Sequence, residues 1–172
     1  MRPIYRASSV IAASELAALA PFDSIILPHD GRYRRRVTMR TEGDLVFLLD
    51  LPEATRLMHG DGLLLEDGRI IAVVAAEEPV VEITANDPHH LARIAWHLGN
   101  RHLPTELLPD RLRILPDAVI EDMVRGLGGT AQRTEARFEP EGGAYGQAAA
   151  HHGHGDHYHG HGAHGHAHPH EH

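Results

Sequence analysis

The alternation of apolar and polar residues in the first half of the chain predicts short β-strands joined by tight turns. Apolar stretches flank two turn-forming pairs, Glu42-Gly43 and Asp67-Gly68. An Asp-Gly pair between apolar runs is a strong local signal for a β-hairpin. Residues 52–58 are a candidate for one or two helical turns. We therefore expect a β-rich N-terminal domain over residues 1–78.

From Pro79 onward the pattern changes to strands that alternate with helices. Asp87-Pro88 supplies an N-cap and a proline at the first helical position, and the helix that follows is expected to end in a left-handed cap at Gly99-Asn100. Strands are expected at residues 80–84, 105–108, 111–115 and 130–138. The order β-α-β-β-α-β predicts a ferredoxin-like domain over residues 79–139, and the chain as a whole belongs to the α+β class.

The second predicted helix begins at Asp117 and stops at Gly128-Gly129. Its spacing predicts that Glu121 and Arg125 pair on the outer side, four residues apart. Its buried face is expected to hold Val119, Ile120, Met123, Val124 and Leu127.

Residues 140–172 form a Gly- and Ala-rich linker and a histidine-rich tail that holds eleven of the 17 histidines. Residues 151–172 contain only one bulky side chain, Tyr158, so we expect this tail to be disordered. Neutral imidazole is a good ligand for nickel, zinc, copper and iron, and about three quarters of such side chains are neutral at pH 7. The tail is therefore interpreted as a metal collector. Its histidines are His151, His152, His154, His157, His159, His161, His164, His166, His168, His170 and His172.

Two simpler roles for the tail fit the sequence less well than metal binding. An engineered purification tag is usually an unbroken run of histidines, whereas here no more than two are adjacent and residues such as Asp156 and Pro169 interrupt the run. A tail that serves only solubility has no need of histidine.

Composition narrows the class of protein further. The chain has no cysteine, which excludes disulfides and thiolate metal sites, and fits a cytoplasmic protein that binds metal reversibly. The absence of an 18-residue apolar run predicts no membrane partner. A formal net charge of −8 argues against nucleic-acid binding. The chain contains no lysine, no phosphate-binding loop and no hydrolase motif, so we expect no enzymatic activity.

One basic stretch departs from this acidic balance. It alternates along a predicted strand and consists of Arg32, Arg34, Arg35, Arg36 and Arg40. A solvated strand face is the simpler interpretation, and a surface that docks a partner is the alternative.

Within the second domain, His97-Leu-Gly-Asn-Arg-His102 follows the first predicted helix. Positively charged side chains at a helix C-terminus are favoured by the helix dipole, so an ordinary capping role is one interpretation of Arg101 and His102. Metal ligation by His102 is the alternative, because a tail that gathers metal must pass the ion to another site. His97 is a weaker candidate ligand, expected to be half-buried.

Several motifs together resemble the UreE family of urease accessory nickel chaperones. They are Gly99-Asn-Arg-His102 after a short helix, Ile120-Glu-Asp-Met123 in the next helix, Phe138-Glu-Pro-Glu-Gly-Gly-Ala-Tyr145 before the tail, and the histidine-rich C-terminus. The resemblance implies a peptide-binding-like first domain, a homodimer and a nickel ligand at His102 on the dimer interface. It also implies delivery of Ni(II) to apo-urease together with a nickel-handling GTPase. Residues 114–119 lack the additional histidines of some members, so the tail must supply the remaining ligands.

Imidazole chemistry alone does not distinguish Ni(II) from Zn(II) or Cu(II). A general store or buffer for zinc, nickel or copper, without a urease partner, shares every feature of the tail. This is the alternative function.

Overall fold

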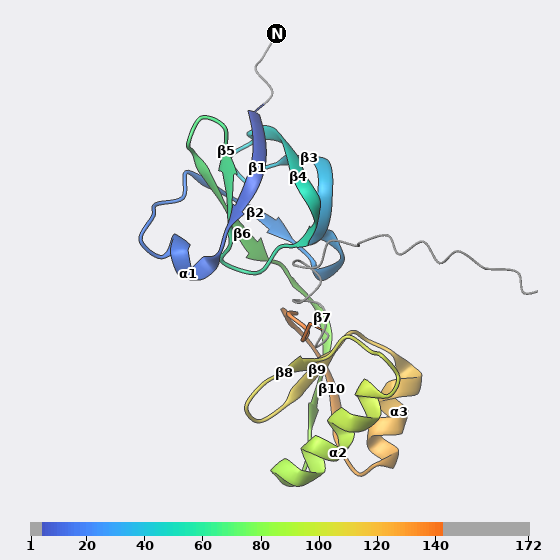
Figure 1. Ribbon diagram of the computed structural model, residues 1–172. Helices are drawn as coiled ribbons and strands as arrows, with labels where there is room; N and C mark the ends of the chain where they lie inside the picture. The colour runs from blue at the N-terminus through green and yellow to red at the C-terminus, as the bar shows by residue number, and fades with distance from the viewer. Residues whose placement is uncertain (1–4, 143–172) are drawn as a thin grey trace, which may run out of the picture. The chain divides into compact units, whose positions relative to one another are not determined.

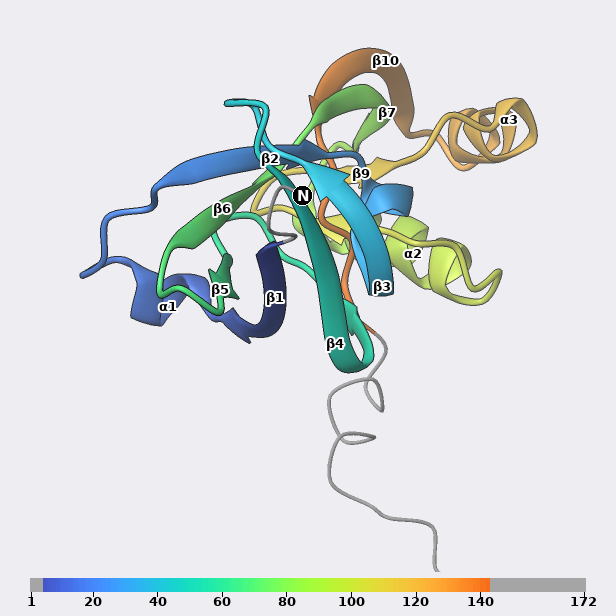
Figure 2. The same cartoon turned by 90° about the horizontal axis from the view of Figure 1, so that it is seen from above.

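The computed structural model describes residues 5–142, which form an α+β fold with two β-sheets, as predicted (Figure 1). The first sheet has six strands in the order β2-β6-β5-β1-β4-β3 and is curled (Figure 2). Pairs β1–β4 and β2–β6 are parallel and the other pairs are antiparallel. Its elements are β1 (Tyr5–Ile11), α1 (Ala13–Leu16), β2 (Asp23–Leu27), the 3-10 turn η1 (His29–Gly31), β3 (Tyr33–Arg40), β4 (Val46–Arg56), β5 (Gly62–Leu65) and β6 (Ile70–Ala75).

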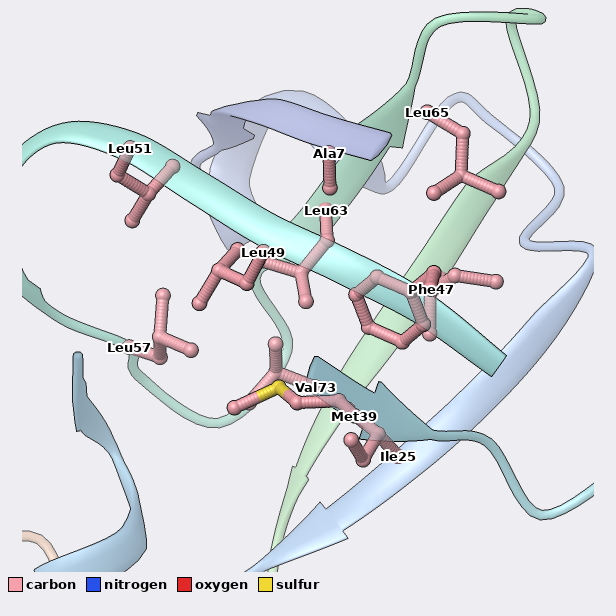
Figure 3. Close-up of a cluster of buried hydrophobic side chains, with 11 residues drawn as sticks. Ala7, Ile25, Met39, Phe47, Leu49, Leu51, Leu57, Leu63, Leu65 and Val73 are labelled. Carbon is pink, nitrogen blue, oxygen red and sulfur yellow. The ribbon is translucent and has the colours of Figure 1, made fainter. Parts of the chain in front are cut away.

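The inner side of this sheet is a continuous apolar core (Figure 3). Phe47, Leu49 and Leu51 point into it from alternate positions of β4, as the two-residue period of a strand requires. The side chains of Phe47 and Leu49 are completely buried, and full burial of each stabilises the fold by about 1.5–3 kcal/mol. Burial of one face of β4 thus fixes its register.

Both predicted hairpins are present, and the predicted helical turn at residues 52–58 is wrong. Strand β4 continues to Arg56 because its last residues pair with the start of β3, Thr55 with Arg34 and Arg56 with Tyr33. A shift in register opposite Arg34 and Arg36 accommodates the extra residues of β4. At the β5–β6 turn, Gly68 has a φ of +87°, a conformation that favours glycine.

Arg32 is not part of an exposed strand face. Its side chain is 1% exposed and lies just before β3. It donates hydrogen bonds to the carbonyl oxygens of Leu57 and Phe138, and to Glu139 Oε1 at 2.9 Å. The alternating pattern of arginines predicted its exposure wrongly, because these partners are distant in sequence.

The second sheet has four strands in the order β10-β7-β9-β8, all antiparallel. Its elements are β7 (Glu77–Thr84), α2 (Pro88–Gly99), β8 (Glu106–Leu107), β9 (Leu112–Ile114), α3 (Ala118–Gly126) and β10 (Thr130–Arg137). This is the predicted β-α-β-β-α-β order. Residues from both helices and from β7 and β9 share one apolar core, so α2 and α3 cover the same face of the sheet (Figure 1).

The buried face of helix α3 differs from the face that the sequence predicted. Val119 is 76% exposed, whereas Glu121, expected outside, is 4% exposed. The carboxylate of Glu121 accepts hydrogen bonds from Arg133 at 2.8 and 3.1 Å and forms the predicted ion pair with Arg125 at 3.3 Å. Arg133 is on β10, so a partner outside the helix makes this burial possible.

This buried carboxylate predicts a dependence of stability on pH. Hydrogen bonding to Arg133, and then its charge, lowers the pKa of Glu121 below its ordinary value. The resulting stabilisation is complete above the unfolded pKa of about 4.3 and is lost as pH falls through the lower, folded pKa. We expect Glu121→Gln to lower the free energy of unfolding by about 1–3 kcal/mol at pH 6 and by less at pH 3, measured by urea unfolding. Glu135→Gln, at an exposed position of β10, is the control; an equal loss at both pH values would contradict the ionic explanation.

Candidate metal centre at the end of helix α2

Helix α2 positions the histidine motif. The Asp87 carboxylate accepts a hydrogen bond from the His90 backbone N–H at 2.8 Å, and Pro88 is the first helical residue, as predicted. Ile94 and Leu98 are completely buried and hold the helix on the sheet. The end of the helix that carries the motif is therefore fixed by packing.

Helix α2 ends at Gly99, as predicted, but the left-handed conformation expected at Gly99-Asn100 is absent. Asn100 keeps a helical conformation, with φ −63°, and the left-handed residue is His102, with φ 54°. The His102 N–H donates to the Gly99 carbonyl at 3.0 Å, which continues the turn for one more residue. The chain then reverses so that Leu103 packs against the second core.

This backbone places His102 in a conformation that is uncommon for a residue with a Cβ atom. The left-handed region costs such a residue on the order of 1 kcal/mol. The His102 side chain is exposed, and its ring makes no hydrogen bond within residues 5–142. Exposed nitrogens on a fixed backbone are available to a ligand, and such backbone outliers often mark functional positions.

The end of the described chain is held close to this histidine. The Glu141 N–H donates to the Thr105 carbonyl at 2.8 Å, and the Glu139 N–H donates to Glu106 Oε2 at 3.3 Å. Thr105 follows His102 by three residues, so their Cα atoms are at most about 11 Å apart. The sequence offered no signal for this contact, because it joins backbone groups 36 residues apart.

Apolar side chains are exposed around the same part of the second sheet. Leu103, Pro104, Ile114, Leu115, Pro116 and Asp117 line a cavity of about 160 Å³. Of these lining residues Leu115 is 38% exposed, and Val119, two residues after Asp117 at the start of α3, is 76% exposed. On α2, Trp96 is 64% exposed. These side chains are suited to contact with another protein surface.

Of the other histidines in residues 5–142, His89 is exposed like His102 but lies at the opposite end of α2, and the other four are less available. His97 is half-buried, as predicted, and its ring packs edge-on against Trp96 with 5.1 Å between centroids. His90 bonds through Nε2 to the Leu127 carbonyl at 2.8 Å, and its Nδ1 accepts from the Asn86 N–H at 3.4 Å. Both ring nitrogens of His90 are thus occupied, and the Nε2 contact links α2 to the end of α3.

Two histidines lie near the first sheet. The His29 ring contacts the Phe138 ring, and burial, followed by the charges of Arg56 and Arg32, lowers the pKa of His29. His59 Nδ1 accepts from the Ala75 N–H at 3.3 Å. Both side chains have contacts that account for their positions without a metal.

Within residues 5–142, no group of three or more His, Cys, Asp or Glu side chains is placed to hold a metal ion. His102 is thus one donor and needs others from outside this part of the chain. The eleven histidines at residues 151–172 lie outside the described residues. No helix in the described part is long and apolar enough to span a bilayer.

Comparison with known proteins agrees with the family resemblance that the sequence motifs indicate. Residues 8–76 match the family model of the UreE urease accessory protein, N-terminal domain, and residues 78–172 match that of its C-terminal domain. The chain belongs to the UreE urease accessory protein family. A urease accessory protein UreE of Bradyrhizobium sp. (strain ORS 278) is 58% identical over 134 residues, which are 78% of this chain and 64% of the relative.

Further UreE relatives give similar values. That of Rhodopseudomonas palustris (strain HaA2) is 59% identical over 76% of this chain and 60% of its own length. That of Chelativorans sp. (strain BNC1) is 52% identical over 87% of this chain and 91% of its own length. The chain therefore spans less than two thirds of some relatives and nearly all of another.

Proposed function

We propose that this chain collects Ni(II) and delivers it to apo-urease while the urease active site is assembled. The observation that carries the proposal is an exposed histidine, His102, held in a left-handed conformation within Gly-Asn-Arg-His of a UreE family member. Nickel is the cargo of this process. The chain acts as a chaperone in it and catalyses no reaction.

His102 alone is an incomplete site. A divalent ion such as nickel, zinc or copper takes four to six donors, whereas within residues 5–142 His102 belongs to no group of three or more side chains placed to hold a metal ion. We propose that two chains associate through the exposed apolar residues Trp96, Leu115 and Val119, so that two copies of His102 meet at a two-fold axis. Tail histidines then complete the coordination shell.

The position of Glu141 supports this role of the tail. Its bond to Thr105 holds Glu141 near His102, and His151 is the tenth residue after Glu141. A flexible segment of that length has a root-mean-square span of about 16–19 Å. Such a tether gives the tail imidazoles a local concentration on the order of millimolar. A shell supplied in part by a tethered segment is released one ligand at a time, which suits transfer.

The remaining parts of the proposal follow the family. Residues 1–78 form a peptide-binding-like domain, residues 79–139 a ferredoxin-like domain for metal binding and dimerisation, and residues 140–172 the linker and disordered collecting tail. The strand order β10-β7-β9-β8 with both helices on one face supports the ferredoxin-like assignment. The partners are apo-urease and its assembly complex with a nickel-handling GTPase, in the cytoplasm.

Transfer to apo-urease tests this function against general metal storage. The nickel-loaded chain is added to apo-urease and its accessory proteins, and urease activity is followed. We expect greater activation than from a peptide of residues 143–172 loaded with the same amount of nickel. A metal buffer would release nickel to apo-urease no better than that peptide, and equal activation would favour storage.

A further inference from the structure

Strand β3 is a free edge of the first sheet. It pairs with β4 alone, and within residues 5–142 no other strand pairs along its outer side (Figures 1 and 2). An edge strand presents a row of backbone N–H and C=O groups that another extended chain can bind. The edge is eight residues long, from Tyr33 to Arg40, which is enough to pair with a short peptide.

The outer face of this edge is basic. Val37 and Met39 pack against the core, so Arg36, Thr38 and Arg40 occupy the opposite face of the strand. The side chains of Arg36 and Arg40 are 68% and 64% exposed. Two of these three outward positions of β3, Arg36 and Arg40, therefore carry guanidinium groups that extend into solvent.

Carboxylates of the described chain neutralise this face only in part. Arg34 and Arg35 have no ion-pair partner within residues 5–142. Arg36 reaches Asp50 at 3.9 Å, but Asp50 is bound more closely, at 2.7 Å, by Arg6. Arg40 pairs with the exposed carboxylate of Asp44 at 3.1 Å. The four arginines of β3 thus outnumber the two carboxylates that pair with them within residues 5–142, although the whole chain has a formal charge of −8.

We propose that the β3 edge binds an extended acidic segment of a partner protein by strand addition. A second copy of this chain is a poor occupant, because pairing two β3 edges would set arginine beside arginine. Nucleic acid is disfavoured by the overall negative charge. An acidic strand satisfies both the backbone groups and the arginines.

The geometry also defines the pattern of the ligand. Side chains of an added strand alternate between the two faces of the sheet. Those on the outer side lie next to Arg36, Thr38 and Arg40, at cross-strand distances of about 4.5–5.5 Å. Acidic residues at every second position of the ligand therefore meet the arginines, whereas a block of consecutive acids places half of them on the other face.

The test uses the full-length chain and two labelled peptides of equal composition, one that alternates threonine with glutamate and one with all glutamates in a block before the threonines. Fluorescence anisotropy at low salt should show tighter binding of the alternating peptide. Arg36→Gln/Arg40→Gln should raise its Kd about tenfold, through loss of two cross-strand charge pairs. Arg93→Gln/Arg125→Gln removes two exposed arginines of α2 and α3 and should leave the Kd unchanged. Hydrogen exchange of amides 33–40 should slow when the peptide binds.

Several outcomes would overturn the proposal. Equal affinity for the two peptides would indicate attraction by net charge without strand addition. Binding of single-stranded oligothymidylate that the Arg36/Arg40 double variant abolishes would assign the edge to nucleic acid instead. Failure of both peptides to bind would leave the arginines with a protective role, since charged edges also oppose aggregation. None of these results depends on nickel.

Discussion

A chain that ends at Ala150 should bind far fewer nickel ions than the full-length chain while its fold stays intact. The tail holds eleven imidazoles, enough for about three ions at three to four nitrogens each. Both apolar cores of the described part are formed by residues within 5–142. We therefore expect a fall from several ions per chain to about one per dimer.

Isothermal titration with Ni(II) gives the stoichiometry, and circular dichroism and light scattering report fold and association. A useful control is titration of the full-length chain at pH 5.5, where protons compete for imidazole and binding should weaken steeply. A truncated chain that unfolds, or that binds as many ions as the full chain, would show that the tail is not the collector. A flat response to pH would indicate carboxylate ligands instead.

Local patterns predicted the elements that depend on local chemistry. Asp87-Pro88 predicted the start of α2, and Asp67-Gly68 predicted the β5–β6 hairpin, because a cap or turn needs only the residues beside it. The β-α-β-β-α-β order followed from the same signals. The motif Gly99-Asn-Arg-His102 also contains the residue that the backbone sets apart, His102.

Features that depend on distant partners were missed. Val119 was expected to be buried and is exposed, whereas Glu121 was expected to be exposed and is buried. Arg133, on another element, pairs with the Glu121 carboxylate. Arg32 was expected on a strand face, and its burial depends on the carbonyl oxygens of Leu57 and Phe138. Periodicity within one element carries no information about such contacts.

The left-handed conformation of His102 is a feature of the candidate site that the sequence pattern did not predict. Glycine and asparagine tolerate this conformation best, so Gly99-Asn100 was the natural expectation. The chain instead places it at His102, at an energetic cost, and leaves an exposed imidazole at the end of a packed helix. The contact of Glu141 with Thr105 holds that end of the described residues close to the same histidine.

Replacing His102 in the chain that ends at Ala150 should abolish its tightest nickel site. His102→Gly is the most informative change, because glycine adopts a φ of 54° without strain. We expect this variant to lose the ion and to unfold at a free energy equal to, or about 1 kcal/mol above, that of the parent. His102→Ala should also lose the ion, without the gain in stability.

Equilibrium dialysis gives nickel per chain, and light scattering gives the dimer, which should survive because apolar residues such as Trp96 and Val119 would form its interface. His97→Ala is the matched control on the same helix and should retain about one ion per dimer. Retention of that ion by the stable His102→Gly variant would exclude His102 as the ligand. Its loss in His97→Ala would then assign the site to the half-buried histidine beside Trp96.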